Sequence, residues 1–430
     1  MTYRKPWFDP NGYPAELRTV RSIVFLVSAL LTQSVVAASN DLTLSETLDL
    51  AFSRQDPTVA RHLAATNALG ERARSESQLP DPQLRFGLVN WPTDSLDYDQ
   101  EPMTQLQVGV KQEFPRGNTR AATRMRLLAE SDVERAAAAL QQRQIKLEVR
   151  SAWLELFYWH RARGSVMQSR AALRELVGVV ESSFATGLQS NQDLLRAELE
   201  LSLLDDRAVD VERQIEVREA DLARFIGAAD AARSLSSALP ELPGLPSPER
   251  LREALLEHPA LLMEDARVRV GARNVDVAKA QFKPGFSVDL GYGARGADRA
   301  DLASVMLLVD IPLFASQRQA PGLAAAEHDR ASAEMARAAR LLELKQALDR
   351  AQADWSGLGE RAGLYEEVVL QRAASSAEAA LAGYQSRVSD FAELIRARLD
   401  YLDMELKLRR LETDRALAHS RLLFIAGESP

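Results

Sequence analysis

Cysteine is absent from this sequence of 430 residues, and proline is absent from two long stretches of it. The lack of cysteine excludes disulfide bonds, cysteine zinc sites, thiol catalysis and an N-terminal lipid on cysteine. No proline lies between Pro115 and Pro240, or between Pro321 and Pro430. Because an interior proline breaks a helix, these stretches, rich in Ala, Leu, Glu and Arg, favour very long helices over a β-sandwich, a barrel enzyme or a disordered chain.

The chain also has no excess of positive charge. The chain has 53 Lys and Arg against 61 Asp and Glu, a net charge of −8, which argues against a nucleic-acid partner. The histidines form no i,i+4 pair and have no acid at ligand spacing; they are His62, His160, His258, His328 and His419. A glycine-rich phosphate loop and a credible catalytic triad are lacking too. The sequence therefore predicts no metal site, no cofactor and no enzymatic activity.

The N-terminus has a basic flank followed by an apolar run. Arg18 and Arg21 precede the apolar stretch 23–31, and small residues follow around Ala37 and Ala38. A basic flank, a short apolar core and an A-x-A-like exit are typical of a secretory signal peptide, here residues 1–38. The alternative is a short membrane anchor, but about nine apolar residues fall below the roughly 20 that a spanning helix needs. No later segment has 18 consecutive apolar residues, so a membrane-spanning mature chain would span by strands.

The sequence of the mature chain contains an internal repeat. A shift of 200 residues superposes Phe184 on Tyr384 and Leu194 on Leu394, and upstream Asp56-Pro57 falls on His258-Pro259. Each copy has the same predicted order: a helix (about Leu44–Gln78, then Pro248–Gln281), two alternating segments, a very long helix and a shorter one. A proline-rich linker, 239–248, separates the first repeat, 39–238, from the second, 249–430. Chance similarity of two Ala-rich helical regions is the alternative to this internal duplication.

The alternating segments predict four strands of about 8–10 residues with period two. Their apolar residues would face lipid and their polar residues water, as in a membrane-spanning strand. The predicted lipid-facing residues are Leu84, Phe86, Leu88, Leu106, Val108, Val110, Phe286, Val288, Leu290, Val305, Leu307 and Val309. Two surface hairpins on a soluble helical body would show the same period.

Hydrogen bonding then limits the number of chains. Four strands cannot close a barrel, and an open strand edge in hydrocarbon leaves N–H and C=O groups unpaired. Two chains would give eight strands with an interior filled by side chains, whereas three would give twelve and a lumen. A conduit therefore favours three chains.

The predicted long helices, Arg120–Phe184 and Arg318–Tyr384, exceed the size of a globular domain. The first would be about 98 Å long. Heptad spacing gives each helix an apolar stripe, for example Leu341, Leu344, Leu348, Ala351, Trp355, Leu358, Ala362 and Tyr365. An ordinary coiled coil has such stripes as well, but it leaves the strand pairs unexplained.

Taken together, the twofold repeat, the helix–strand–strand–long-helix order and two helix-turn-helix motifs resemble the TolC-type outer-membrane factor family. Phe184-Ala185-Thr186-Gly187 with Asp193 has its counterpart in Tyr384 with Glu393. The resemblance implies a mainly α fold with a small β part, in which three chains share a transmembrane β-barrel and a long α-helical barrel. It also implies a homotrimer in outer-membrane lipid, with its helices in the periplasm. The implied partners are a periplasmic adaptor and an inner-membrane pump of the proton-driven resistance-nodulation-division type.

One segment resembles the heavy-metal branch of this family, which exports cobalt, zinc, cadmium or copper. It is Leu79-Pro80-Asp81-Pro82-Gln83-Leu84-Arg85-Phe86-Gly87, followed by Asn90-Trp91-Pro92. The implied function is a passive exit duct of a tripartite efflux system for heavy-metal cations. A drug-efflux or type I secretion duct is the alternative, as is a soluble periplasmic coiled-coil scaffold.

The resemblance also assigns the site residues. It places two turns at the periplasmic tip, against the adaptor: Thr186, Gly187 and Leu188, and Ser386, Arg387 and Val388. Arg387 stands where the family usually has glycine. Asp193 and Glu393 would form acidic rings at the closed entrance, although an acid in a first helical turn also offsets the helix dipole.

Overall fold

The structure is a computed structural model that describes residues 41–186, 190–296 and 298–427. The predicted signal peptide, 1–38, lies outside these residues. The first half of the chain forms α1 (Leu44–Ser53), α2 (Pro57–Ser75), β1 (Gln83–Val89), β2 (Gln105–Phe114), α3 (Thr119–Ala185), α4 (Asn191–Ile226) and α5 (Ala228–Ala231). The second half forms α6 (Pro248–Ala254), η1 (Leu255–Glu257), α7 (Pro259–Ala280), β3 (Gly285–Arg295), β4 (Leu302–Asp310), α8 (Gln319–Leu364), η2 (Tyr365–Val369), α9 (Leu370–Gln385) and α10 (Phe391–Ala426).

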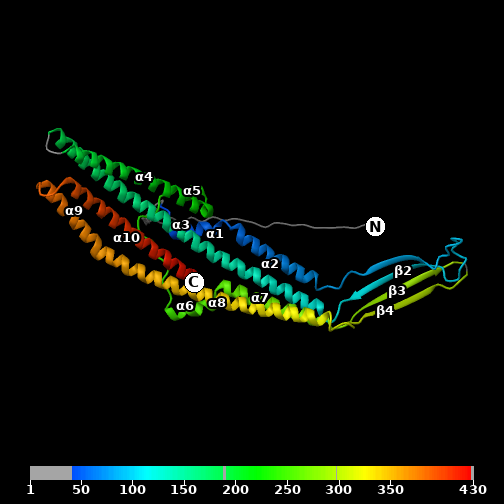
Figure 1. The fold of residues 1–430 in the computed structure, drawn as a ribbon. Coiled ribbons are helices and arrows are strands. Elements are labelled where there is room, and N and C mark those ends of the chain that lie inside the picture. Colours follow the sequence, from blue (N-terminus) through cyan, green and yellow to red (C-terminus); the bar gives the residue numbers. More distant parts are fainter. Residues whose placement is uncertain (1–40, 187–189, 297, 428–430) are drawn as a thin grey trace, which may run out of the picture. The chain divides into compact units, whose positions relative to one another are not determined.

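The predicted fold class, mainly helical with a small sheet, is confirmed. The four strands form one antiparallel sheet in the order β1-β2-β3-β4. The helix α3 runs beside α2, α4, α7 and α10, and α8 runs beside α7 and α10 (Figure 1). Among the described helices, none is long and apolar enough to cross a membrane.

The helices that precede the strands are broken where the sequence predicted continuous ones. Asp56 Oδ1 accepts a hydrogen bond from Thr58 N at 2.7 Å, so a new helix begins at Pro57. In the second half, His258 Nδ1 accepts from Ala260 N at 3.2 Å, and α7 begins at Pro259. Each proline has no N–H to donate and stands at the first helical position, where none is needed.

Helix pairing follows the predicted heptads. Of the α8 stripe, Leu344, Leu348, Ala351 and Ala362 are buried. Beyond Ala362 the helical path passes through one π-helical turn, η2, before α9 continues. The sequence did not predict this turn, because the apolar period runs through it.

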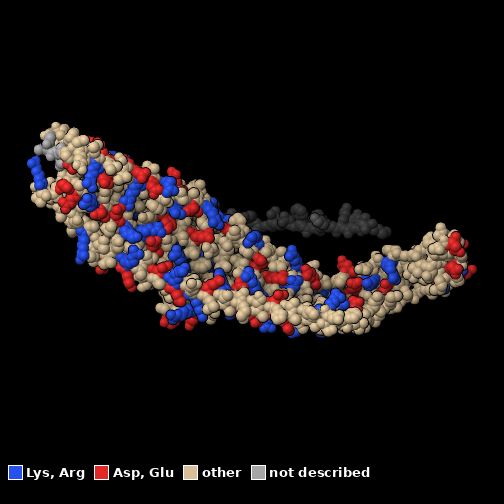
Figure 2. Space-filling view, in the orientation of Figure 1, with Lys and Arg blue, Asp and Glu red and all other residues tan. Residues whose placement is uncertain are grey.

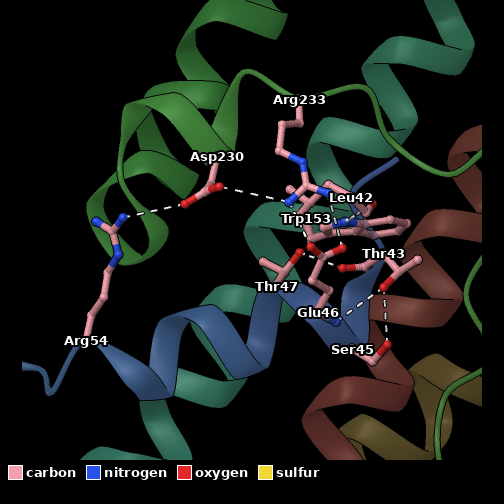
Figure 3. A network of polar contacts seen from close by, with 9 residues as sticks. All are labelled: Leu42, Thr43, Ser45, Glu46, Thr47, Arg54, Trp153, Asp230 and Arg233. Carbon is pink, nitrogen blue, oxygen red and sulfur yellow. Dashed lines mark hydrogen bonds and ion pairs between the residues drawn. The ribbon is translucent and has the colours of Figure 1, made fainter. Parts of the chain in front are cut away.

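The largest core cluster joins α3, α4 and α10 to the segment around Leu42. Trp153 of α3 has no exposed surface, stacks on Phe157, and donates its indole N–H to the Leu42 carbonyl at 3.3 Å. Figure 3 shows this contact beside the ion pair between Glu46 and Arg233, whose atoms approach to 2.8 Å. The start of the described chain is thereby fixed to α3 and to the segment that follows α5.

Candidate functional site

The sheet places the predicted lipid-facing residues on one face. Phe86 pairs with Val108 and Val108 with Tyr292, while Leu84, Val110, Leu290 and Val305 form the next row across all four strands. Strand alternation puts every second residue on the same side, so these rows make one continuous apolar surface. All twelve predicted residues lie on it.

The apolar face of the sheet is exposed instead of packed on a protein core. Phe86 and Val305 are 71% and 77% exposed, whereas Ser287 and Asp289 on the opposite face are buried. Leu88 and Val288 are half-buried, and the other ten predicted residues are exposed. A half-solvated sheet normally buries its apolar face on the core. This sheet exposes its apolar face along all four strands. Its other face is buried in β3, at Ser287 and Asp289, and exposed on the edge strands, at Arg85 and Asp310. None of the predicted lipid-facing residues is buried in a helical interior.

Charged side chains follow the same division. On the face seen in Figure 2, Lys, Arg, Asp and Glu are mixed over the helices and are sparse over the strands. The charges that the strands do carry belong to the polar face. Among them Arg85 of β1 and Asp289 of β3 form an ion pair at 3.1 Å. The sequence did not predict this pair, since its members are 204 residues apart.

The second helical turn has a defined geometry. Val388 N donates to Gly383 O at 2.9 Å and Arg387 N to Tyr384 O at 3.0 Å, the two bonds of a Schellman motif. Arg387 has φ 59°, the left-handed conformation that glycine adopts at lowest cost. Arg387 therefore adopts a backbone conformation that suits glycine better, at some cost in strain. Val388 beside it is 84% exposed.

The first helical turn is described in part. Thr186 Oγ1 donates to Ser183 O at 3.0 Å at the end of α3. Gly187 and Leu188 lie outside the described residues. Ser386, the counterpart of Thr186, likewise donates its hydroxyl to the preceding turn, to Ala382 O at 2.9 Å.

The two predicted gate acids stand in different surroundings. Asp193 Oδ2 accepts from Ser190 Oγ at 2.6 Å and from Ser190 N at 3.3 Å, and Ser190 Oγ accepts from Asp193 N, which completes a capping box. Glu393 donates only its backbone N–H, to Asp390 Oδ1 at 2.8 Å, and its side chain is exposed. Asp193 thus has a capping role in one chain, and Glu393 has a carboxylate with no hydrogen bond or ion pair to the described residues.

Other polar groups cluster where α3 meets α10. Arg410 makes two 2.8 Å bonds to the Glu155 carboxylate and one of 2.6 Å to Asp414, and its guanidinium lies over the Tyr158 ring. The two carboxylates raise the pKa of Arg410 further. This cluster ties two helices together. Within the part of the chain that the structure describes, no group of three or more His, Asp or Glu could hold a metal ion.

Each half of the chain thus has a long antiparallel helical pair and one hairpin of a shared sheet whose apolar face is exposed. A family model described as outer membrane efflux protein matches residues 251–428. Over these residues the chain matches the family that the sequence resembles, and this match supports the family prediction.

Solved structures extend the likeness to most of the chain. A membrane protein from Pseudomonas aeruginosa is similar with a TM-score of 0.78 at 16% identity, over 90% of each chain. The outer membrane protein VceC from Vibrio cholerae has a TM-score of 0.75 at 17% identity, over 90% of this chain and 96% of its own. The CmeC outer membrane channel from Campylobacter jejuni has a TM-score of 0.75 at 12% identity, over 90% of this chain and 86% of its own. No curated protein matches the chain.

Proposed function

We propose that three copies of this chain form the outer-membrane exit duct of a tripartite efflux system, through which substrates pass without an energy source in the duct itself. The observation that carries the proposal is the apolar face of the sheet, which is exposed across all four strands, while Gln105, Ser287 and Asp289 on the polar face are buried. Apolar surface exposed to water costs about 25 cal/mol per Å², so such a face is stable only against lipid or another apolar surface. Lipid on one side and a wet lumen on the other fit both faces.

The unpaired edge strands of the sheet support an assembly of three chains. Neither β1 nor β4 has a second neighbour among the described strands. In hydrocarbon each free edge would leave its N–H and C=O groups unpaired, at several kcal/mol each. If β4 of one chain pairs with β1 of the next, three chains close a twelve-stranded barrel with a lumen.

The internal repeat predicts the register of this pairing. In the first hairpin Gln83 pairs with Lys111, and in the second Gly285 pairs with Asp310. The hairpins therefore superpose with shifts of 202 residues for β1 on β3 and 199 for β2 on β4. Applied to the pair of Val110 with Leu290 between β2 and β3, these shifts place Val309 opposite Leu88 of the next chain.

A disulfide between those two positions tests the duct. The chain has no cysteine, so Leu88→Cys with Val309→Cys introduces the only thiols. Under mild oxidation in outer membranes we expect covalent dimers and trimers on a denaturing gel, because paired strands bring Cα atoms within disulfide range.

Matched controls decide whether the register is specific. Each single cysteine has no partner and should leave the chain monomeric on the gel. Leu88→Cys with Val305→Cys keeps the same face but moves one thiol four residues, about 13 Å along the strand, and should link poorly. A correctly folded double variant that links no better than the single ones would contradict the shared barrel.

In this duct the helices would lie in the periplasm, with their turns at the periplasmic tip. There the exposed Val388, with Thr186, Gly187, Leu188, Ser386 and Arg387, would contact a periplasmic adaptor, which joins the duct to an inner-membrane pump of the proton-driven resistance-nodulation-division type. Three copies of Asp193 and Glu393 would form acidic rings that favour cations at the entrance. The carboxylate of Glu393, which has no hydrogen bond or ion pair to the described residues, supports such a ring more directly than Asp193, which also caps α4.

Heavy-metal cations are the proposed cargo, on the support of the segment 79–92. Deleting the gene should lower the tolerance of the cell to at least one of Zn²⁺, Co²⁺, Cd²⁺ and Cu⁺, because export across the outer membrane would stop. Restoring the gene should restore tolerance. If tolerance to all four is unchanged while tolerance to organic drugs falls, the duct remains and its cargo is a drug.

A further inference from the structure

All six charged residues of the strands lie on the polar face, and their charges balance. Three are cationic, namely Arg85, Lys111 and Arg295, and three are anionic, namely Glu113, Asp289 and Asp310. The pairing register puts every one of them opposite to the row of Phe86 and Val108. In the proposed duct this face lines the lumen, so the strands would carry no net charge there.

The Arg85 side chain crosses a neighbouring strand to reach its partner. Its Nη2 lies 3.1 Å from Asp289 Oδ1, although β2 separates β1 from β3. Gly109 of β2 is paired with Arg85 on one side and with Gly291 on the other. A Cβ atom at Gly109 would lie 3.3 Å from Arg85 Nη2 and 3.1 Å from the Leu290 carbonyl. The two glycines leave the space over which the guanidinium lies.

Asp289 is buried, so the loss of either member of the Arg85–Asp289 pair would leave a charge without its partner. Asp289 is 6% exposed, while the Arg85 side chain is half-exposed. Lys111 stands opposite Asp289 in the register but binds Glu113, at 2.9 Å. Loss of Arg85 would therefore leave a carboxylate without its cation, and loss of Asp289 would leave a cation without its carboxylate.

We propose that the Arg85–Asp289 pair determines the ion selectivity of the strand section of the duct, by keeping its lumen wall neutral. This inference rests on the proposed function. With the pair intact, cations and anions meet a wall without net charge. Removal of one partner adds a ring of three like charges, which attracts the opposite ion and repels its own kind.

Reversal potentials of the purified protein in planar bilayers, under a KCl gradient, test the proposal. Arg85→Gln should raise the ratio of K⁺ to Cl⁻ permeability, and Asp289→Asn should lower it. We expect changes of about two- to fivefold at low salt, where the Debye length is about 10 Å or more. The double variant restores the neutral wall and should return to the value of the unmodified protein.

Two conservative variants separate charge from shape. Arg85→Lys keeps the positive charge but loses the planar fork, and should retain the original selectivity. Gln107→Ala, on the same face, changes volume without charge and should also leave selectivity unchanged. Asp193→Asn with Glu393→Gln is measured alongside, because the proposed gate role predicts lower cation selectivity for that variant.

The outcomes distinguish this inference from the proposed function. If the unmodified protein forms no pores, the duct itself is wrong. If it forms pores whose selectivity changes in neither single variant, the duct holds and the role of the Arg85–Asp289 pair is wrong. If the Arg85→Gln variant does not assemble, the Asp289→Asn variant still tests the pair, because it leaves unpaired only an arginine that is half-exposed. An unchanged ratio of K⁺ to Cl⁻ permeability in Asp289→Asn is then sufficient to overturn the role of the pair in selectivity.

Discussion

Replacement of Trp153 by alanine is expected to lower the free energy of unfolding by about 3–5 kcal/mol. Trp153 has no exposed surface and its ring stacks on Phe157 with centroids 5.4 Å apart. Alanine would leave a cavity in the cluster where α3, α4 and α10 meet. It would also remove the hydrogen bond to the Leu42 carbonyl, which fixes the N-terminal segment to α3.

The loss can be divided between packing and hydrogen bonding. Trp153→Phe keeps an aromatic ring but has no N–H, so it should cost less than alanine, about 1–3 kcal/mol. Trp91→Ala, at a tryptophan that is 44% exposed, should change the stability much less than Trp153→Ala. The midpoint of heat denaturation, followed by far-ultraviolet circular dichroism in detergent, ranks the three variants. A Trp153→Ala midpoint equal to that of Trp91→Ala would contradict the assignment of Trp153 to the core.

The sequence predicts what local geometry controls. The period of two in β1 to β4 places Phe86, Val108 and Val305 on one face because strand side chains alternate. The heptads of α8 place Leu344 and Leu348 in the interface for a similar reason, since the helical period brings them to one side. Neither inference needs knowledge of the neighbouring chain segments.

Contacts between residues far apart in the sequence could not be predicted in this way. Arg85 and Asp289 meet only because two hairpins from different halves of the chain join between β2 and β3. Gly109 and Gly291 lie inside strands, where glycine is typical of a position that another group approaches closely. What approaches them depends on the register, and no period in the sequence encodes it.

The breaks between α1 and α2 and before α7 were not predicted from the sequence, although the residues that cause them are local. Pro57 and Pro259 were visible, yet the apolar period continues on both sides of each, so the sequence predicted one helix where the structure has two. The capping atoms decide the break, namely Asp56 Oδ1 and His258 Nδ1, each of which accepts the N–H two residues later. A side-chain acceptor before a proline is therefore a better signal of a helix start than the apolar period is of continuity.

The histidine cap of α7 should make the stability of the protein depend on pH. His258 has no exposed surface, and its Nδ1 accepts from Ala260 N. Burial lowers the pKa of His258 from 6.5 to about 4, helped by the nearby cations Arg143 and Arg340. A proton on Nδ1 would also remove the acceptor on which the cap depends, because both ring nitrogens of the imidazolium are donors.

The sign of the effect follows from the two pKa values. In the unfolded chain His258 takes up a proton near pH 6.5, whereas in the folded chain it does so near pH 4. Between these values the unfolded state binds more protons, so the contribution of His258 is fully present above pH 6.5 and is lost as the pH falls towards 4. Because the two values differ by about 2.5, the full loss is about 3 kcal/mol.

A variant that caps without titrating isolates this contribution. His258→Asn keeps a side-chain acceptor before Pro259 but binds no proton in this range, so heat denaturation should shift less between neutral and acidic buffer than in the unmodified protein. The smaller asparagine lowers the midpoint at neutral pH, which is why the measured quantity is the difference between the two buffers and not either midpoint alone. His328→Asn, on an exposed part of α8, should leave that difference unchanged. If His258→Asn shows the same pH dependence as the unmodified protein, carboxylates elsewhere cause the acid sensitivity and the cap of α7 does not contribute to it.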